Sequence, residues 1–112
     1  MIVVTGAADF TIGSGTAFAN KSLDASAATG DITATIGAAV STIKTGSGAD
    51  SITFAANALT SADTIDGGAG ADTLVMGEVA GGNHNPTITG VETITINVAN
   101  ASTQLNLSKT TG

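Results

Sequence analysis

Short segments in which apolar residues alternate with hydroxyl-bearing residues run along most of the chain. Five segments carry an apolar side chain at every second position: residues 32–36 (ITATI), 51–54 (SITF), 73–76 (TLVM), 87–89 (TIT) and 93–96 (TITI). A period of two predicts a β-strand with one buried face. Gly- or Asn-containing turns separate these segments and leave no room for long crossover helices. Only residues 55–62, where Ala and Leu are spaced for one or two helical turns, are expected to be able to form a helix.

Two kinds of internal repetition favour a β-solenoid over a sandwich or a barrel. Residues 23–30 (LDASAATG) return 82 positions later as residues 105–112 (LNLSKTTG). Residues 10–12 (FTI) have a counterpart in residues 94–96 (ITI), 84 positions later. Residues 1–112 are therefore expected to form a single solenoid fragment, with about one and a third copies of a long repeat from a tandem array.

A shorter repeat places an aspartate two residues before an Ile or Leu. Asp63-Thr64-Ile65 recurs nine residues later as Asp72-Thr73-Leu74, and Asp50-Ser51-Ile52 is a third copy. Glycines precede two of the copies, in residues 46–50 (GSGAD) and 68–72 (GAGAD). The 22 residues from Asp50 to Asp72 correspond to two nonapeptides plus a four-residue insertion, which we place within residues 54–61.

Residues 67–75 (GGAGADTLV) fit the nonapeptide G-G-x-G-x-D-x-U-x, where U is a large apolar residue, and residues 45–53 (TGSGADSIT) fit it except at the first glycine. Residues 45–75 thus resemble the calcium-binding repeats of the repeats-in-toxin (hemolysin-type) family. The resemblance implies a parallel β-roll in which the first six residues of each repeat form a Ca²⁺-binding turn and the last three form a short strand.

The chemistry of these turns is consistent with calcium. Glycine tolerates positive φ, which lets a tight turn direct carbonyl groups inward. Ca²⁺ takes six to eight oxygen ligands, so one turn is insufficient and the ion is expected between two stacked turns. The Asp50 and Asp72 turns, about one coil apart, are the natural pair. The candidate metal-binding residues are Gly46, Gly48, Asp50, Asp63, Gly68, Gly70 and Asp72.

A broader resemblance rests on residues 88–96 (ITGVETITI) and 23–26 (LDAS). Together with the Gly-x-Gly-x-Asp turns, they look like bacterial surface-layer proteins and large repetitive adhesins. This resemblance implies a cell-surface location, a calcium-dependent structural role and export by a type I route.

Composition and charge narrow the alternatives. Ala, Gly and Thr make up nearly half of the 112 residues, and the formal net charge is −6, with three Lys or Arg. Such a chain cannot build the basic patch that nucleic-acid or membrane-surface binding requires. It contains no Cys, so disulfides do not stabilise it, and no apolar run of the roughly 20 residues that span a bilayer.

Catalysis is not expected. Residues 3–8 (VVTGAA) imitate the start of a short-chain dehydrogenase, but Phe10 and Ile12 occupy the places of its later glycines. His84 is the only His and has no Cys as a partner for zinc binding or nucleophilic chemistry. Asp63 and Asp66 could imitate a pair of catalytic carboxylates, but no aromatic platform for a sugar accompanies them.

The sequence therefore predicts an all-β, right-handed parallel β-solenoid with short strands and Gly-Asp turns. The expected function is that of a calcium-stabilised building block of a bacterial surface layer or extracellular fibre, self-associating into a lattice or filament. One alternative is an adhesin or ice-binding module that uses a Thr-rich face. Its Thr-x-Thr segments, residues 33–35, 87–89 and 93–95, are not spaced at one constant length. A second alternative is the calcium-folding region of a secreted enzyme.

Overall fold

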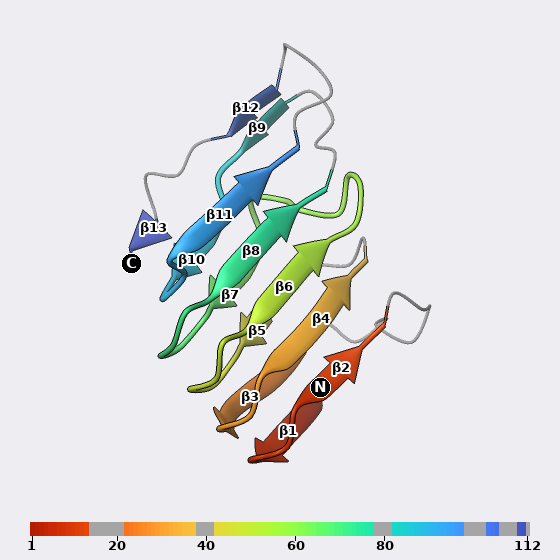
Figure 1. The fold of residues 1–112 in the computed structure, drawn as a ribbon. Coiled ribbons are helices and arrows are strands. Elements are labelled where there is room, and N and C mark those ends of the chain that lie inside the picture. The colour runs from red at the N-terminus through yellow and green to blue at the C-terminus, as the bar shows by residue number, and fades with distance from the viewer. Residues whose placement is uncertain (14–21, 38–41, 78–81, 98–102, 106–109, 112) are drawn as a thin grey trace.

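The chain forms a parallel β-solenoid of about four turns (Figure 1). A computed structural model describes residues 1–13, 22–37, 42–77, 82–97, 103–105 and 110–111. Every strand pair in these ranges is parallel, and the described residues contain no helix. The prediction of an all-β parallel solenoid is confirmed.

Two large sheets form opposite sides of the solenoid. Sheet A holds six strands, β1 (Ile2–Gly6), β3 (Ser22–Ala28), β5 (Thr42–Lys44), β7 (Thr64–Asp66), β10 (Thr87–Thr89) and β13 (Thr110–Thr111). Sheet B holds five strands, β2 (Phe10–Ile12), β4 (Ile32–Ile36), β6 (Ser51–Phe54), β8 (Thr73–Met76) and β11 (Thr93–Ile96). A two-stranded sheet C consists of β9 (Gly82–His84) and β12 (Thr103–Leu105).

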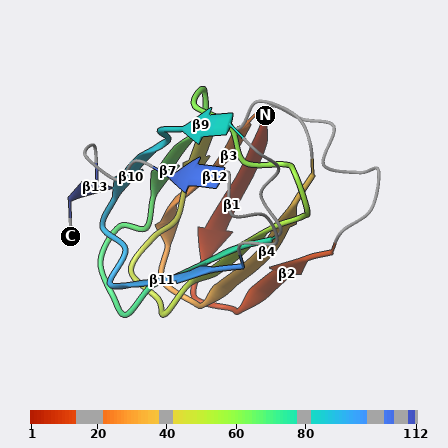
Figure 2. The same cartoon turned by 90° about the horizontal axis from the view of Figure 1, so that it is seen from above.

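Each coil runs along a strand of sheet A, turns, and returns along a strand of sheet B, as the view along the stack shows (Figure 2). The strand register gives a coil length that ranges from 18 residues (Thr33 paired with Ser51) to 23 (Thr64 paired with Thr87). Because all strands are parallel, residues in equivalent positions of successive coils lie in columns that run along the stack.

The core consists of such columns. In sheet A, Leu23, Ile43, Ile65 and Ile88 occupy paired positions and are buried. In sheet B the sequence Ala34, Ile52, Leu74 forms the equivalent buried column. Alternation with a period of two therefore places one apolar side chain per coil into each column, which is why small and β-branched residues suffice for this thin core.

All five strands expected from the alternation are present with the expected bounds: β4, β6, β8, β10 and β11. The expectation of a helix at residues 55–62 was wrong. This segment forms turns, in which Asn57 has a φ of 59° and the N–H of Ala58 donates to the carbonyl oxygen of Ala55 at 3.0 Å. A positive φ at a non-glycine residue is incompatible with a right-handed helix.

The strand pairing repeats once per coil, and the long repeat has no equivalent in it. Leu23 lies in β3 of sheet A, whereas Leu105 lies in β12 of sheet C. Residues 106–109 and 112 of the second copy are outside the described residues. The long repeat stays a prediction, while coil length is the period that positions side chains.

Glycines allow the turns between the sheets to stack closely. An ideal Cβ on Gly68 would lie 2.1 Å from the carbonyl oxygen of Gly46, and one on Gly70 would lie 2.0 Å from that of Gly48. On Gly46 it would lie 1.9 Å from the carbonyl oxygen of Ala28. Backbone groups of neighbouring coils thus occupy the space that any side chain would need.

We expect Gly68→Ala to destabilise the protein by at least about 2 kcal/mol, because it combines this clash with a φ of 83°, a left-handed conformation that costs an L-residue about 1–2 kcal/mol. Gly37→Ala is the matched control, since no heavy atom lies within 4 Å of its ideal Cβ. Urea unfolding followed by circular dichroism measures both. Equal stability of the two variants would contradict the stacking role of Gly68.

Candidate acidic edge of the solenoid

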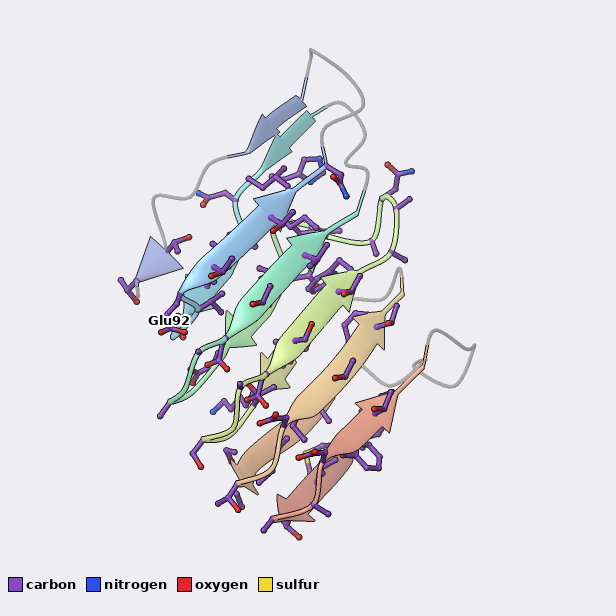
Figure 3. The ribbon with its side chains drawn as sticks, in the orientation of Figure 1. Glu92 is labelled. Atoms are coloured by element: carbon purple, nitrogen blue, oxygen red, sulfur yellow. The ribbon has the colours of Figure 1, made fainter. Side chains whose placement is uncertain are left out.

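An acidic residue stands directly before every strand of sheet B. We name the set the acidic edge; its members are Asp9, Asp31, Asp50, Asp72 and Glu92. Each lies in the turn that carries the chain from sheet A to sheet B, so one carboxylate per coil follows the same edge of the stack. Figure 3 shows Glu92 in the turn that precedes β11.

Three carboxylates of the acidic edge accept hydrogen bonds from the preceding coil. Asp50 Oδ1 accepts from the N–H of Ile32 at 2.7 Å, and Asp72 Oδ1 accepts from the N–H of Asp50 at 2.8 Å. Glu92 Oε2 accepts from the N–H of Asp72 at 2.8 Å. Each of these carboxylates therefore satisfies a backbone donor of its neighbour and ties two coils together.

Asp9 and Asp31 make the opposite connection, because they accept from the following coil. Asp9 Oδ1 accepts from the N–H of Asp31 at 3.0 Å, and Asp31 Oδ1 accepts from the N–H of Ala49 at 2.7 Å. The direction changes between Asp31 and Asp50. There the register pairs Thr33 with Ser51, which sets Asp50 opposite Ile32 and not opposite Asp31.

This one-residue shift decides which carboxylates are buried. In a strand, neighbouring positions face opposite sides, so a shift by one moves a side chain from solvent to core. Asp9, Asp31 and Glu92 are exposed, whereas Asp50 is 2% and Asp72 is 1% exposed. Asp50 and Asp72 thus occupy the core position that Ile32 holds one coil earlier.

The buried pair is incompletely satisfied. Asp50 Oδ2 and Asp72 Oδ2 are both buried without a hydrogen-bond partner. Burial raises the pKa of the Asp72 carboxyl above its ordinary value, the hydrogen bond from the Asp50 N–H opposes this, and the charges of Asp50 and Glu92 raise it further. By contrast, hydrogen bonds from Ser26 lower the pKa of Asp24 on sheet A.

The two glycine-rich turns are longer than the others. Residues 45–50 and 67–72 each contribute six residues between the sheets, whereas residues 29–31 and 90–92 contribute three. The two long turns belong to consecutive coils and are connected by the hydrogen bond from the N–H of Ala69 to the carbonyl oxygen of Gly46 at 2.9 Å. They form one adjacent pair, flanked on either side by a short turn.

Six of the seven predicted metal-binding residues are brought together in this pair of turns. Gly46 contacts Gly68, Gly48 contacts Gly70, and Asp50 is hydrogen-bonded to Asp72. Only Gly68 and Gly70 have a positive φ, while Gly46 and Gly48 do not, so the expectation of left-handed glycines applies to the second turn alone.

Asp63 does not join this group. It precedes β7, so the whole of that strand separates it from the turn at residues 67–72. Asp63 Oδ2 accepts from the N–H and the hydroxyl of Thr60, at 2.5 and 3.1 Å. Its side chain therefore organises the loop on the opposite side of the coil.

Sequence reasoning missed Asp9, Asp31 and Glu92 as members of the acidic edge. The available signal was an acidic residue immediately before a segment that begins one strand per coil. Spacings of 22, 22 and 20 residues, for Asp9–Asp31, Asp50–Asp72 and Asp72–Glu92, separate its members.

Among the described residues, no group of three or more His, Cys, Asp or Glu side chains is placed to hold a metal ion. Any cation at the acidic edge would thus need backbone carbonyl ligands besides Asp50 and Asp72. In the same part of the chain, no helix has the length and apolar character needed to cross a membrane. No family model, curated protein or solved structure matches the chain.

In the presence of a chelator, the raised pKa of Asp72 gives a pH dependence of known sign. The folded protein binds more protons at this group than the unfolded protein, so its contribution to stability is full below the unfolded pKa and is lost as pH rises through the folded pKa. Asp72→Asn keeps the Oδ1 acceptor and removes the charge. We expect the free energy of unfolding of Asp72→Asn, relative to wild type, to increase from pH 4 to pH 7. Urea unfolding at several pH values measures it, and a relative decrease would contradict the prediction.

Proposed function

We propose that this chain is a calcium-stabilised structural building block of an extracellular assembly, in which copies associate through the ends of the solenoid. The observation that carries the proposal is the stacking of two buried carboxylates, Asp50 and Asp72, each with an oxygen that lacks a partner. The resemblance of residues 45–75 to calcium-binding repeats supports the same ion, and the likeness to surface-layer proteins supports the extracellular location.

The donor atoms at this edge fit a hard cation. Asp50 and Asp72 make the same hydrogen bond to the coil before them, so their free oxygens are in equivalent places. Equivalent atoms on adjacent strands are about 4.8 Å apart. That separation is about twice a calcium–oxygen distance of roughly 2.4 Å.

Calcium would be held by the carboxylates of Asp50 and Asp72 and by carbonyl groups of Gly46, Gly48, Gly68 and Gly70. The ion would supply positive charge between two buried carboxylates that have no cationic partner within the described residues. Unpaired buried charges destabilise a fold strongly, so binding would stabilise the folded state. One adjacent pair of long turns provides one such site per chain.

The ends of the sheets support association between copies. β1 and β2 lie at one end of sheets A and B, and β13 and β11 lie at the other. Ile12 of β2 and Ile94 of β11 are partly buried members of the same column, through Ala34, Ile52 and Leu74. The strand edge of one copy would therefore continue the columns of the next.

Calcium titration tests the first part of this proposal. We expect Ca²⁺ to raise the melting temperature followed by circular dichroism, with a stoichiometry of one ion per chain in calorimetry, because the ion binds the folded state. Asp72→Ala should remove most of this shift.

Asp24→Asn is the control for that titration, because Asp24 faces outward on β3 and its loss removes one charge away from the pair. It should keep the shift of the wild type. A melting temperature that does not respond to calcium would refute the calcium site, and an unchanged response in Asp72→Ala would place the ion elsewhere.

Self-association is tested by sedimentation velocity across a range of protein concentrations with calcium present. We expect species larger than the monomer that grow with concentration. Ile12→Lys, which puts a charge into the column at the β2 end, should shift the distribution towards monomer, whereas Thr5→Lys, exposed on β1, should not. A wild type that remains monomeric at high concentration would refute this part.

A further inference from the structure

The outer face of sheet B carries two straight columns of hydroxyl-bearing side chains, which we name the threonine grid. The first column is Thr11, Thr33, Ser51, Thr73 and Thr93, and the second is Thr35, Thr53, Val75 and Thr95. All nine residues alternate with the core residues of β2, β4, β6, β8 and β11 and are exposed or half-buried. Figure 1 shows these five strands side by side in one layer.

The structure explains why the sequence concealed this grid. The distances along the chain between its rows are 22, 18, 22 and 20 residues. Turns of three or six residues and the loops that lead back to sheet A absorb the difference, so the strands remain in register. Thr87–Thr89, which was grouped with the other Thr-x-Thr segments, lies in β10 of sheet A and is not part of the grid.

The hydroxyls of the grid are available to a ligand. None of the eight Thr and Ser hydroxyls makes a hydrogen bond within the described part of the chain. Elsewhere hydroxyls are used inside the protein: Thr45 donates to the carbonyl oxygen of Gly67 at 2.7 Å, and Thr89 donates to that of Ile65 at 3.4 Å. Stabilisation of the strands through Thr–Thr hydrogen bonds is therefore not what the grid provides.

The two large sheets differ in the charge of their outer faces. On sheet A, Asp24, Lys44 and Asp66 lie in register and form a charged row. The grid on sheet B contains no charged residue, and the exposed carboxylates of the acidic edge lie beside it without entering it. A ligand that fits the grid is therefore uncharged and repetitive.

The spacings of the grid define that ligand further. Neighbouring strands are about 4.8 Å apart, and residues i and i+2 of one strand are about 6.7 Å apart. Over the four steps between five strands the grid extends about 19 Å. A rectangular lattice with these two repeats is close to that of the water oxygens on a prism face of hexagonal ice. Thr methyl groups lie between the hydroxyls and fit the spaces of such a lattice.

We propose that the threonine grid binds the surface of ice. An insoluble polysaccharide is the other repetitive, uncharged surface, but its recognition relies on aromatic side chains that stack on sugar rings. The chain has no Trp or Tyr, and among the grid strands only Phe10, at the edge in β2, is an exposed aromatic residue. Ice binding does not depend on the calcium site beyond the need for a folded solenoid.

Thermal hysteresis and partition of the purified protein into a growing ice hemisphere test the proposal. We expect the wild type to enter the ice and to shape its crystals. Thr53→Tyr places a bulky ring at the centre of the grid in a residue type that strands accept, and it should abolish most of both effects. Thr35→Tyr repeats the test one strand away, and the melting temperature of each variant shows that it is folded.

Thr64→Tyr is the matched control, because Thr64 is a half-buried, outward-facing residue of β7 in the middle of sheet A, between Thr42 and Thr87. It should leave the hysteresis unchanged. Exclusion of the folded wild type from ice, or equal losses in Thr53→Tyr and Thr64→Tyr, would overturn the proposal. So would retention on cellulose or chitin without retention in ice. Ice binding that persists in chelator would leave the grid proposal intact and count against calcium alone.

Discussion

Hydrogen bonding between successive coils is the constraint on which the rest of the structure depends. Once each strand pairs in parallel with the equivalent strand of the next coil, any residue type that recurs once per coil becomes a continuous column about 4.8 Å per step. The buried Ile and Leu columns, the stacked glycines, the acidic edge and the threonine grid are four results of this single rule. Side chains that a compact globular fold would separate are here held next to their own copies.

The same rule concentrates like charges, and the protein balances this in two ways. Exposed carboxylates such as Asp31 and Glu92 remain in water, where repulsion is screened. Asp50 and Asp72 lack this relief, and the backbone N–H groups of Ile32 and Asp50 offset only part of the unfavourable burial. The free oxygens of this pair make the apo fold weakest at the point where the glycine-rich turns meet.

The sequence was informative where a local pattern determines the structure. Alternation located β4, β6, β8, β10 and β11, because one buried face per strand requires it. It gave no warning of β5 and β7, where Ile43 and Ile65 are single apolar residues between polar neighbours. The Ala-rich segment before Asp63 was misinterpreted as helical, because its turn depends on Asn57 and on packing of Ala58 and Leu59 against the core.

The candidate site was predictable in part for the same reason. The nonapeptide pattern placed Gly46, Gly48, Gly68 and Gly70 in one pair of turns, since both copies carry it. It could not reveal that Asp63 belongs to the opposite side of the coil, or that Glu92 continues the column of Asp72. Both facts depend on the register between coils, and loops of unequal length hide that register from any search at a fixed spacing.

The one-residue shift between Asp31 and Asp50 has a consequence for folding fidelity. Strands as repetitive as Thr93–Ile96 and Thr73–Met76 could align in several ways that all bury an apolar side chain, which invites mispairing between coils and between molecules. A displacement by two residues would leave the Asp72 carboxylate in the core without the N–H of Asp50. The buried acids thus penalise every alignment except the native one, and they supply the uniqueness that a core of near-identical residues lacks.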